Sequence, residues 1–267
     1  MSRITPKLES LKRAGRKALI PFITAGDPTP EFTVPALHAL VEAGADIIEL
    51  GVPFSDPMAD GPVIQRASER ALAHKMSLRK VLEQVREFRQ KDDSTPVVLM
   101  GYLNPVESLG YRNFVDKARE VGVDGVLTVD MPPEESSEFL PMLDESGIDP
   151  IFLLAPNSTA ERIAKMGQLG RGYLYYVSLK GVTGASHLNL DDVAHKIKEI
   201  RQLTSLPIAV GFGVKNAETA AAISKLGDGV VVGSALVSKI EAAGGDTRLA
   251  LKEITALISS MRSSLDA

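Results

Sequence analysis

Residues 42–52, EAGADIIELGV, decide the fold. The glycine suits the left-handed position that ends a helix. The apolar run after it does not alternate with polar residues, which is typical of a parallel strand buried on both faces. The same order of helix, glycine and strand recurs in REVGVD (119–124), ESGID (145–149) and KLGDG (225–229). This repeat predicts alternating helices and strands around a parallel sheet.

Eight short apolar runs, rich in β-forming residues, indicate eight strands in one chain. They cover residues 18–26, 46–52, 96–102, 124–130, 150–156, 173–179, 207–213 and 228–234. Amphipathic stretches between and after them predict helices over residues 30–45, 63–75, 77–91, 106–122, 134–147, 158–170, 190–203, 216–227 and 246–265. Eight such units predict an α/β protein, a (β/α)8 TIM barrel, in a single domain spanning 1–267. The competing open sheet usually carries GxGxxG after its first strand, and TAGDPTP at residues 24–30 does not match it.

The composition, 44% hydrophobic and 24% charged, is that of a soluble globular protein. The net charge of −4 gives no basic excess for nucleic acid. Because the chain has no cysteine, disulfides, thiolate metal sites and a cysteine nucleophile are excluded. The polar, basic N-terminal segment does not resemble a signal peptide, and the apolar runs are too short for a membrane span. We expect a cytoplasmic protein.

Glu49 lies within an apolar strand, and a loop with Asp56 and Asp60 follows it. A buried carboxylate without a partner is costly, so it either pairs with a Lys or Arg or serves chemistry. In a barrel, the loop returns over the carboxyl ends of the strands, where active sites form. Two carboxylates near one substrate can divide acid and base roles. For Glu49 alone, the structural and catalytic interpretations both remain open.

Three glycine-rich segments follow the last three strands, at Gly184, Gly213, and Gly233 with Ser234. Barrels often bind phosphate with the loops after strands seven and eight, where backbone N–H groups meet a helix start. Three such segments at neighbouring strand ends favour a phosphate site over glycines that merely make tight turns. The four histidines show no metal-binding spacing, so we expect no metal.

With these residues in view, the chain resembles the α subunit of tryptophan synthase over its whole length. The most specific match is ELGVPFSDPMADG, residues 49–61. Further matches are FITAGDP (22–28), M-x-Y-x-N-P (100–105), D-x-P-x-E-E-S (130–136), GRGYLYYVS (170–178), GVTGA (181–185), VGFGV (210–214) and GSALV (233–237).

The resemblance implies cofactor-free cleavage of indole-3-glycerol phosphate to indole and glyceraldehyde 3-phosphate. It implies that indole passes to a β subunit, which carries pyridoxal phosphate, within an α2β2 complex. Glu49 and Asp60 take the catalytic positions. The implied substrate neighbours are Phe22, Met100, Leu127, Tyr175, Thr183 and Phe212, and the implied phosphate site is Gly184, Gly213, Gly233 and Ser234. The implied partner interface contains Pro53, Asp56, Pro57, Asn104 and Asp130.

Three alternatives remain open from the sequence. One is the same reaction in a stand-alone lyase that has no β partner. Another is a Schiff-base aldolase, for which Lys180 at the end of a strand is the sole candidate. The third is a non-catalytic phosphate-binding barrel, which would need the glycine segments but not Glu49 and Asp60 together.

Overall fold

The structure, a computed structural model, describes residues 1–177, 190–211 and 213–267. Its described strands lie parallel in one sheet, in the order β5-β4-β3-β2-β1-β9-β8-β7-β6. They are β1 (Ala18–Thr24), β2 (Ile48–Gly51), β3 (Val97–Gly101), β4 (Gly125–Thr128), β5 (Asp149–Pro150), β6 (Phe152–Leu154), β7 (Leu174–Val177), β8 (Ile208–Gly211) and β9 (Gly229–Val232).

The fifth expected strand is present in two pieces, β5 and β6. β5 pairs with β4, whereas β6 pairs with β7. Ile151 lies between the pieces and donates its backbone N–H to Val126 at 2.9 Å. The two ends of the sheet order are therefore joined through the chain itself, and the predicted (β/α)8 barrel is confirmed.

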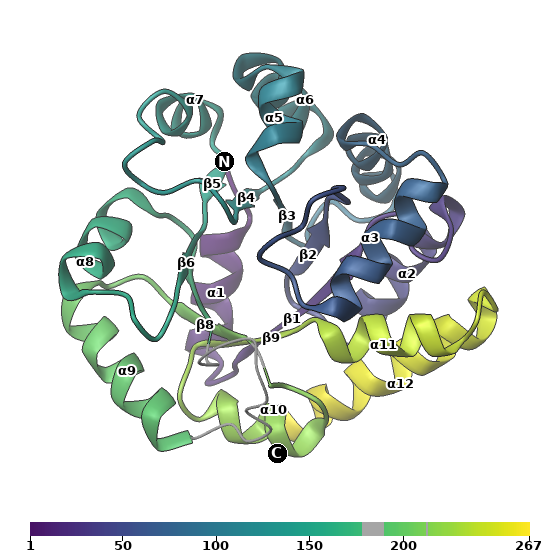
Figure 1. The fold of residues 1–267 in the computed structure, drawn as a ribbon. Helices are drawn as coiled ribbons and strands as arrows, with labels where there is room; N and C mark the ends of the chain where they lie inside the picture. Colours follow the sequence, from purple (N-terminus) through teal and green to yellow (C-terminus); the bar gives the residue numbers. More distant parts are fainter. Residues whose placement is uncertain (178–189, 212) are drawn as a thin grey trace.

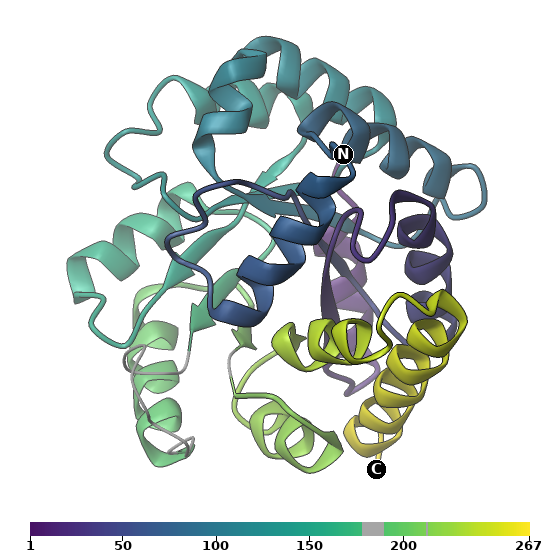
Figure 2. The ribbon, with the colours of Figure 1, turned by 45° about the vertical axis from the view of Figure 1, so that its right-hand side comes forward.

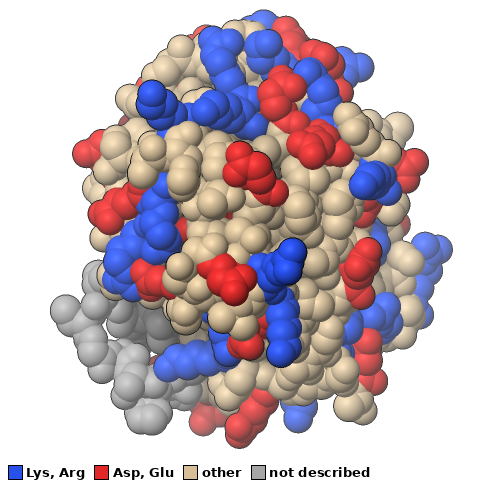
Figure 3. Space-filling view, turned by 90° about the vertical axis from the view of Figure 1, so that its right-hand side faces the viewer, with Lys and Arg blue, Asp and Glu red and all other residues tan. Residues whose placement is uncertain are grey.

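Helices surround the strands in both views (Figures 1 and 2). They are α1 (Ile4–Arg13), α2 (Pro30–Glu42), α3 (Pro62–Ala73), α4 (Leu78–Arg89), α5 (Leu103–Leu109), α6 (Tyr111–Val121), α7 (Phe139–Ser146), α8 (Ala160–Leu169), α9 (Leu190–Leu203), α10 (Ala217–Ser224), α11 (Ser234–Ala242) and α12 (Thr247–Leu265). No helix in this part of the chain combines the length and apolar character needed to cross a membrane. On the face in Figure 3, acidic and basic side chains are interspersed.

The expected helices differ from the observed ones at four places. The stretch 106–122 forms two helices, because Gly110 has a φ of 85° and starts α6 as its N-cap. The stretch 134–147 becomes helical only from Phe139. The sequence patterns also missed α1 and α11. Ile4, Leu8 and Leu11 of α1 are buried in the same apolar cluster as the barrel interior. Because Ile4 contacts the positions of Gly125 and Gly172, α1 closes the amino-terminal end of the barrel.

Three aspartates begin strands and tie them to their neighbours. Asp46 accepts the backbone N–H of Leu19 at 2.9 Å, and Asp228 accepts that of Ile208 at 2.9 Å. Asp124 accepts the backbone N–H of Val97, also at 2.9 Å. Each carboxylate also pairs with an arginine: Arg262 with Asp46, Arg201 with Asp228, and both Arg3 and Arg89 with Asp124. In three of the four repeats of the helix–glycine–strand pattern, the aspartate therefore ties its strand to a neighbour, whereas Oδ2 of the fourth aspartate, Asp149, has no hydrogen-bond partner.

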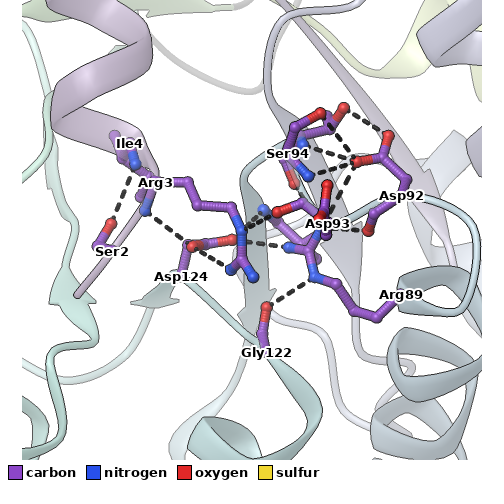
Figure 4. Close-up of polar contacts among 11 residues, drawn as sticks. Ser2, Arg3, Ile4, Arg89, Asp92, Asp93, Ser94, Gly122 and Asp124 are labelled. Carbon is purple, nitrogen blue, oxygen red and sulfur yellow. Dashed lines mark hydrogen bonds and ion pairs between the residues drawn. The ribbon is translucent and has the colours of Figure 1, made fainter.

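Asp124 holds the most contacts of these three aspartates (Figure 4). Its Oδ1 accepts the backbone N–H of Arg3 and the Arg3 guanidinium, both at 2.9 Å. Its Oδ2 accepts Arg89 Nη2 at 2.8 Å. Arg89 also donates to the carbonyl of Gly122, two residues before Asp124, at 3.0 Å. These bonds join α1, α4 and the start of β4 at the amino-terminal end of the barrel.

Replacing Asp124 should destabilise the fold strongly. In Asp124→Asn the guanidinium of Arg89 keeps its carbonyl acceptors but loses the buried carboxylate that balances its charge, and removing one member of a buried pair costs about 3–5 kcal/mol. The measurement is the free energy of unfolding from urea titration. Glu145→Gln breaks the exposed pair with Arg112 and serves as the control, with an expected loss below about 1 kcal/mol. Equal losses in the two variants would contradict this role of Asp124.

Candidate active site

Alternate residues of each strand face the barrel interior, so the strand patterns decide which side chains meet there. The interior apolar cluster contains Ile20 from β1, Val98 from β3, Tyr175 from β7 and Val231 from β9. Glu49 pairs in register with Phe22 of β1 and Val98 of β3. It therefore belongs to the inward-facing set, and its carboxylate enters an apolar interior.

The Glu49 carboxylate is fully buried. Its Oε1 accepts a hydrogen bond from the Tyr173 hydroxyl at 2.6 Å, whereas its Oε2 has no partner. Burial raises the pKa of Glu49 to about 7, although the Tyr173 bond opposes the shift. Among the described residues, no Lys or Arg forms an ion pair with this carboxylate. The group is poised to gain or lose a proton near neutral pH.

Asp60 lies in the loop between β2 and α3, and Tyr102 holds it. The Tyr102 hydroxyl donates to Asp60 Oδ2 at 3.1 Å and accepts the backbone N–H of Ala59 at 2.9 Å. Burial raises the pKa of Asp60, and the Tyr102 bond opposes that rise. Tyr102 also contacts the ring of Phe54, with 5.1 Å between ring centroids. Sequence reasoning placed Tyr102 at a strand end but gave it no role.

Two of the expected wall residues, Phe22 and Met100, line one cavity together with Asp60. Leu127 pairs in register with Met100 and is buried in the barrel interior beside Tyr175. The pKa of Tyr175 is raised by burial and then by the negative charges of Glu49 and Asp60, so both carboxylates lie within electrostatic reach of it. The structure thus brings these expected residues together at one end of the barrel.

The same cavity contains residues that the sequence did not single out for the site. Thr24, Ser68 and Tyr102 supply its polar lining beside Asp60. Thr24 is an inward-facing residue at the end of β1, and its buried hydroxyl has no hydrogen-bond partner. Its position at a strand end was visible in the sequence, but that the hydroxyl is buried and unpartnered is a property of the closed barrel.

The expected phosphate residues lie at the ends of two neighbouring strands. Gly213 follows β8 and has a φ of 80°, a conformation that favours glycine. Gly233 follows β9 and is the N-cap of α11, and Ser234 is the first residue of that helix. A side chain at Gly233 would meet Phe22 at 3.7 Å, so this helix start adjoins the apolar wall. Thr183, Gly184 and Phe212 lie outside the described residues, as does Lys180.

The residues expected at a partner interface fall in two places. Asp56 is exposed and accepts Ser55 Oγ at 2.5 Å, Pro57 is half-buried, and Pro53 is buried within this chain. Asn104 and Asp130 are both exposed, and Asp130 accepts the backbone N–H of Leu103 at 2.8 Å. That bond holds the start of α5 against the end of the fourth barrel strand.

In the described chain, no three His, Asp or Glu side chains gather in a way that could hold a metal ion. One of the four histidines, His38, lies against Phe88 with 4.7 Å between ring centroids.

A (β/α)8 barrel with two carboxylates of raised pKa, an apolar wall and a glycine-capped helix start at one end has the architecture of a barrel enzyme. Comparison with known proteins identifies the family of this enzyme. The family model for the tryptophan synthase alpha chain matches residues 8–266. The chain therefore belongs to the tryptophan synthase alpha chain family.

Individual relatives agree with that assignment. The tryptophan synthase alpha chain of Methylococcus capsulatus is 68% identical over 267 residues, covering 100% of both chains. The chain of the same name from Laribacter hongkongensis is 59% identical, again with 100% of both covered. A crystal structure of tryptophan synthase subunit alpha from Legionella pneumophila has a TM-score of 0.93 at 47% identity and covers 100% of this chain and 99% of its own.

The raised pKa of Glu49 predicts a pH-dependent stability difference. The folded state holds this proton up to about pH 7, whereas the unfolded state releases it near 4.5, so wild type loses stability as the pH rises between those values. Glu49→Gln lacks this loss, which amounts to about 3 kcal/mol. The measurement is urea unfolding of both proteins from pH 4 to 8. Tyr173→Phe removes the opposing bond and should extend the loss to higher pH, and parallel profiles in wild type and Glu49→Gln would contradict the prediction.

Tyr102→Phe should raise the pKa of Asp60, because the donor that lowers it is lost while the burial remains. The measurement is a carboxyl-carbon NMR titration of Asp60. Tyr111→Phe is the matched control, since it removes a tyrosine hydroxyl bonded to Glu107 on the exposed surface. A fall or no change in the pKa of Asp60 in Tyr102→Phe would show that Tyr102 does not govern this carboxylate.

Proposed function

We propose that Glu49 carries out the proton transfers of the reaction catalysed by this family, the cleavage of indole-3-glycerol phosphate to indole and glyceraldehyde 3-phosphate, and that Asp60 stabilises the charge that develops on the indole. The observation that carries the proposal is the buried Glu49 carboxylate, with one free oxygen and a pKa of about 7. Such a group changes protonation state within the neutral range, as an acid–base catalyst must.

The reaction is a retro-aldol cleavage that conserves all atoms of the substrate. Protonated Glu49 gives its proton to indole C3, which forms the indolenine tautomer. The bond between C3 and the glycerol side chain then breaks. Its electron pair forms the C2=C3 double bond of indole, and the π electrons of the C=N⁺ bond become the lone pair of the ring nitrogen. Glu49, now a carboxylate, takes the proton of the side-chain hydroxyl as that carbon becomes an aldehyde. The catalyst thereby regains its starting state.

Asp60 has a separate task in this proposal. Its carboxylate accepts a hydrogen bond from the indole N–H and stabilises the positive charge that develops on the ring. The Tyr102 bond favours the ionised form of Asp60, which suits an acceptor. The two carboxylates thus differ in setting: Glu49 is fully buried with a pKa of about 7, whereas the burial that raises the pKa of Asp60 is opposed by the Tyr102 hydroxyl.

The remaining residues bind the substrate. Phe22, Met100 and Leu127 contact the indole, with Tyr175 beside it. The start of α11, at Gly233 and Ser234, and Gly213 receive the phosphate, which suits the positive end of a helix. Thr24 supplies an unpartnered hydroxyl for the polar side chain of the substrate. The assignments of Gly184, Phe212 and Thr183 rest on the family resemblance alone.

We further propose that the chain acts as one domain, 1–267, in the cytoplasm, without a cofactor of its own. The family name implies a β subunit, and among the solved relatives are structures of tryptophan synthase from M. tuberculosis, one of which aligns with a TM-score of 0.88 at 34% identity. An α2β2 assembly, with pyridoxal phosphate on β and indole passed between the sites, follows from this membership. The loop at Asp56 and Pro57 and the exposed Asn104 and Asp130 are the proposed contacts.

The test is indole release from indole-3-glycerol phosphate, with and without a β subunit. Glu49→Gln should lower turnover by about 10²–10⁴-fold, because general acid–base catalysis is lost. Binding of glycerol 3-phosphate should remain unchanged, because the phosphate end is intact. A β subunit should accelerate the wild-type reaction. Turnover by Glu49→Gln at the wild-type rate would contradict the role of Glu49, and full activity without β would favour the stand-alone lyase.

A further inference from the structure

Away from the reacting carboxylates, four charged side chains form one connected network. Arg70 on α3 donates to both carboxylate oxygens of Asp27, from Nε at 2.7 Å and from Nη2 at 3.0 Å. Its third contact is Nη1 to Glu241 on α11, at 2.8 Å. Arg66, one turn earlier on α3, donates to the two oxygens of Glu241 at 2.6 and 2.8 Å.

Arg70 and Arg66 differ in what they hold. Asp27 is fully buried, and Arg70 is the residue that binds its carboxylate in the ion pairs of the described chain. Arg66 is about half exposed, with 48% of its side chain accessible, and among the ion pairs of the described residues it joins only Glu241. Arg70, on helix α3, thus connects that helix to both the loop after β1 and helix α11. Arg66 adds a second contact between α3 and α11 but does not reach the loop after β1.

The helices joined by Arg70 carry the two ends of the proposed site. Helix α3 begins at Pro62, two residues after Asp60, and helix α11 begins at Ser234. Their strands, β2 and β9, lie on either side of β1, which leads to Asp27. Below the network, Ala67 of α3 and Val237 of α11 pack with Phe22 of β1. These elements therefore form one packed unit with the network across it.

We propose that Arg70 is a positioning residue that fixes the separation between Asp60 and the phosphate-binding start of α11. The inference rests on the proposed function, because it requires one substrate to reach both places. Indole-3-glycerol phosphate has its ring N–H at one end and its phosphate at the other. A rigid link between α3 and α11 lets both ends bind in the reacting geometry, and small misplacements of reacting groups lower rates steeply.

The test compares binding of a ligand that occupies only the phosphate end with turnover of the substrate, which must reach both Asp60 and the start of α11. In Arg70→Met, kcat/KM for indole-3-glycerol phosphate should fall by about tenfold to a hundredfold. The Kd of glycerol 3-phosphate, which occupies only the phosphate end, should stay within about twofold, since the start of α11 is intact. Arg66→Met is the matched control and should leave both quantities near wild type.

A second variant controls for the loss of stability that an unpaired, buried Asp27 carboxylate would cause in Arg70→Met. In Asp27→Asn/Arg70→Met the buried charge is removed together with its partner, so the thermal midpoint should recover while kcat/KM remains low. Recovery of kcat/KM in this double variant would overturn the proposal, as would equal losses of kcat/KM and glycerol 3-phosphate binding in Arg70→Met. An unchanged kcat/KM in Arg70→Met would also overturn it. Failure of the wild type to cleave the substrate would instead overturn the proposed function.

Discussion

The inward alternation of side chains in a closed parallel barrel is the constraint on which this molecule depends. Every second residue of a strand must enter an interior that contains almost no water, and there apolar side chains are favoured. Glu49 breaks that pattern. The desolvation that raises its pKa also makes the carboxylate useful, because a group that is partly protonated at neutral pH can both give and take a proton. The apolar layers around Glu49 therefore stabilise the barrel and tune its proposed catalyst at the same time.

The two ends of the barrel use carboxylates in opposite ways. At the amino-terminal end, Asp46, Asp124 and Asp228 each accept a backbone N–H from a neighbouring strand and pair with at least one arginine. At the carboxyl-terminal end, Glu49 and Asp60 each receive a tyrosine hydroxyl on one oxygen. An arginine partner stabilises the charged carboxylate, whereas a neutral hydroxyl partner leaves the carboxylate freer to exchange a proton or bind a ligand. This division agrees with the general rule that barrels keep stability at one end and chemistry at the other.

Arg70 places a similar ion pair at the carboxyl-terminal end of the barrel, where its half-buried guanidinium holds the buried carboxylate of Asp27. A hydrophobic contact between α3 and α11 would hold the helices together, but it would allow them to slide. A bidentate arginine has a directional geometry, so it also fixes how the helices are oriented. Such precision matters where one substrate has to meet two helices that begin at different strands. The buried charge of Asp27 is acceptable there because the same arginine neutralises it.

The sequence by itself determined the barrel, since the repeated helix–glycine–strand pattern and the non-alternating strands are local properties of the chain. It also determined the family, because the motifs around Glu49 and Asp60 are contiguous. It did not determine α1, a short and mostly polar segment whose few apolar residues pack against the amino-terminal end of the barrel. Only the tertiary structure decided which hydroxyls meet the carboxylates. Tyr173 lies 124 positions from Glu49, and Tyr102 lies 42 from Asp60, so no local pattern relates either pair. The same holds for Arg70, Asp27 and Glu241, because their pairing depends on strand order in a closed sheet, and closure brings together residues that the sequence keeps far apart.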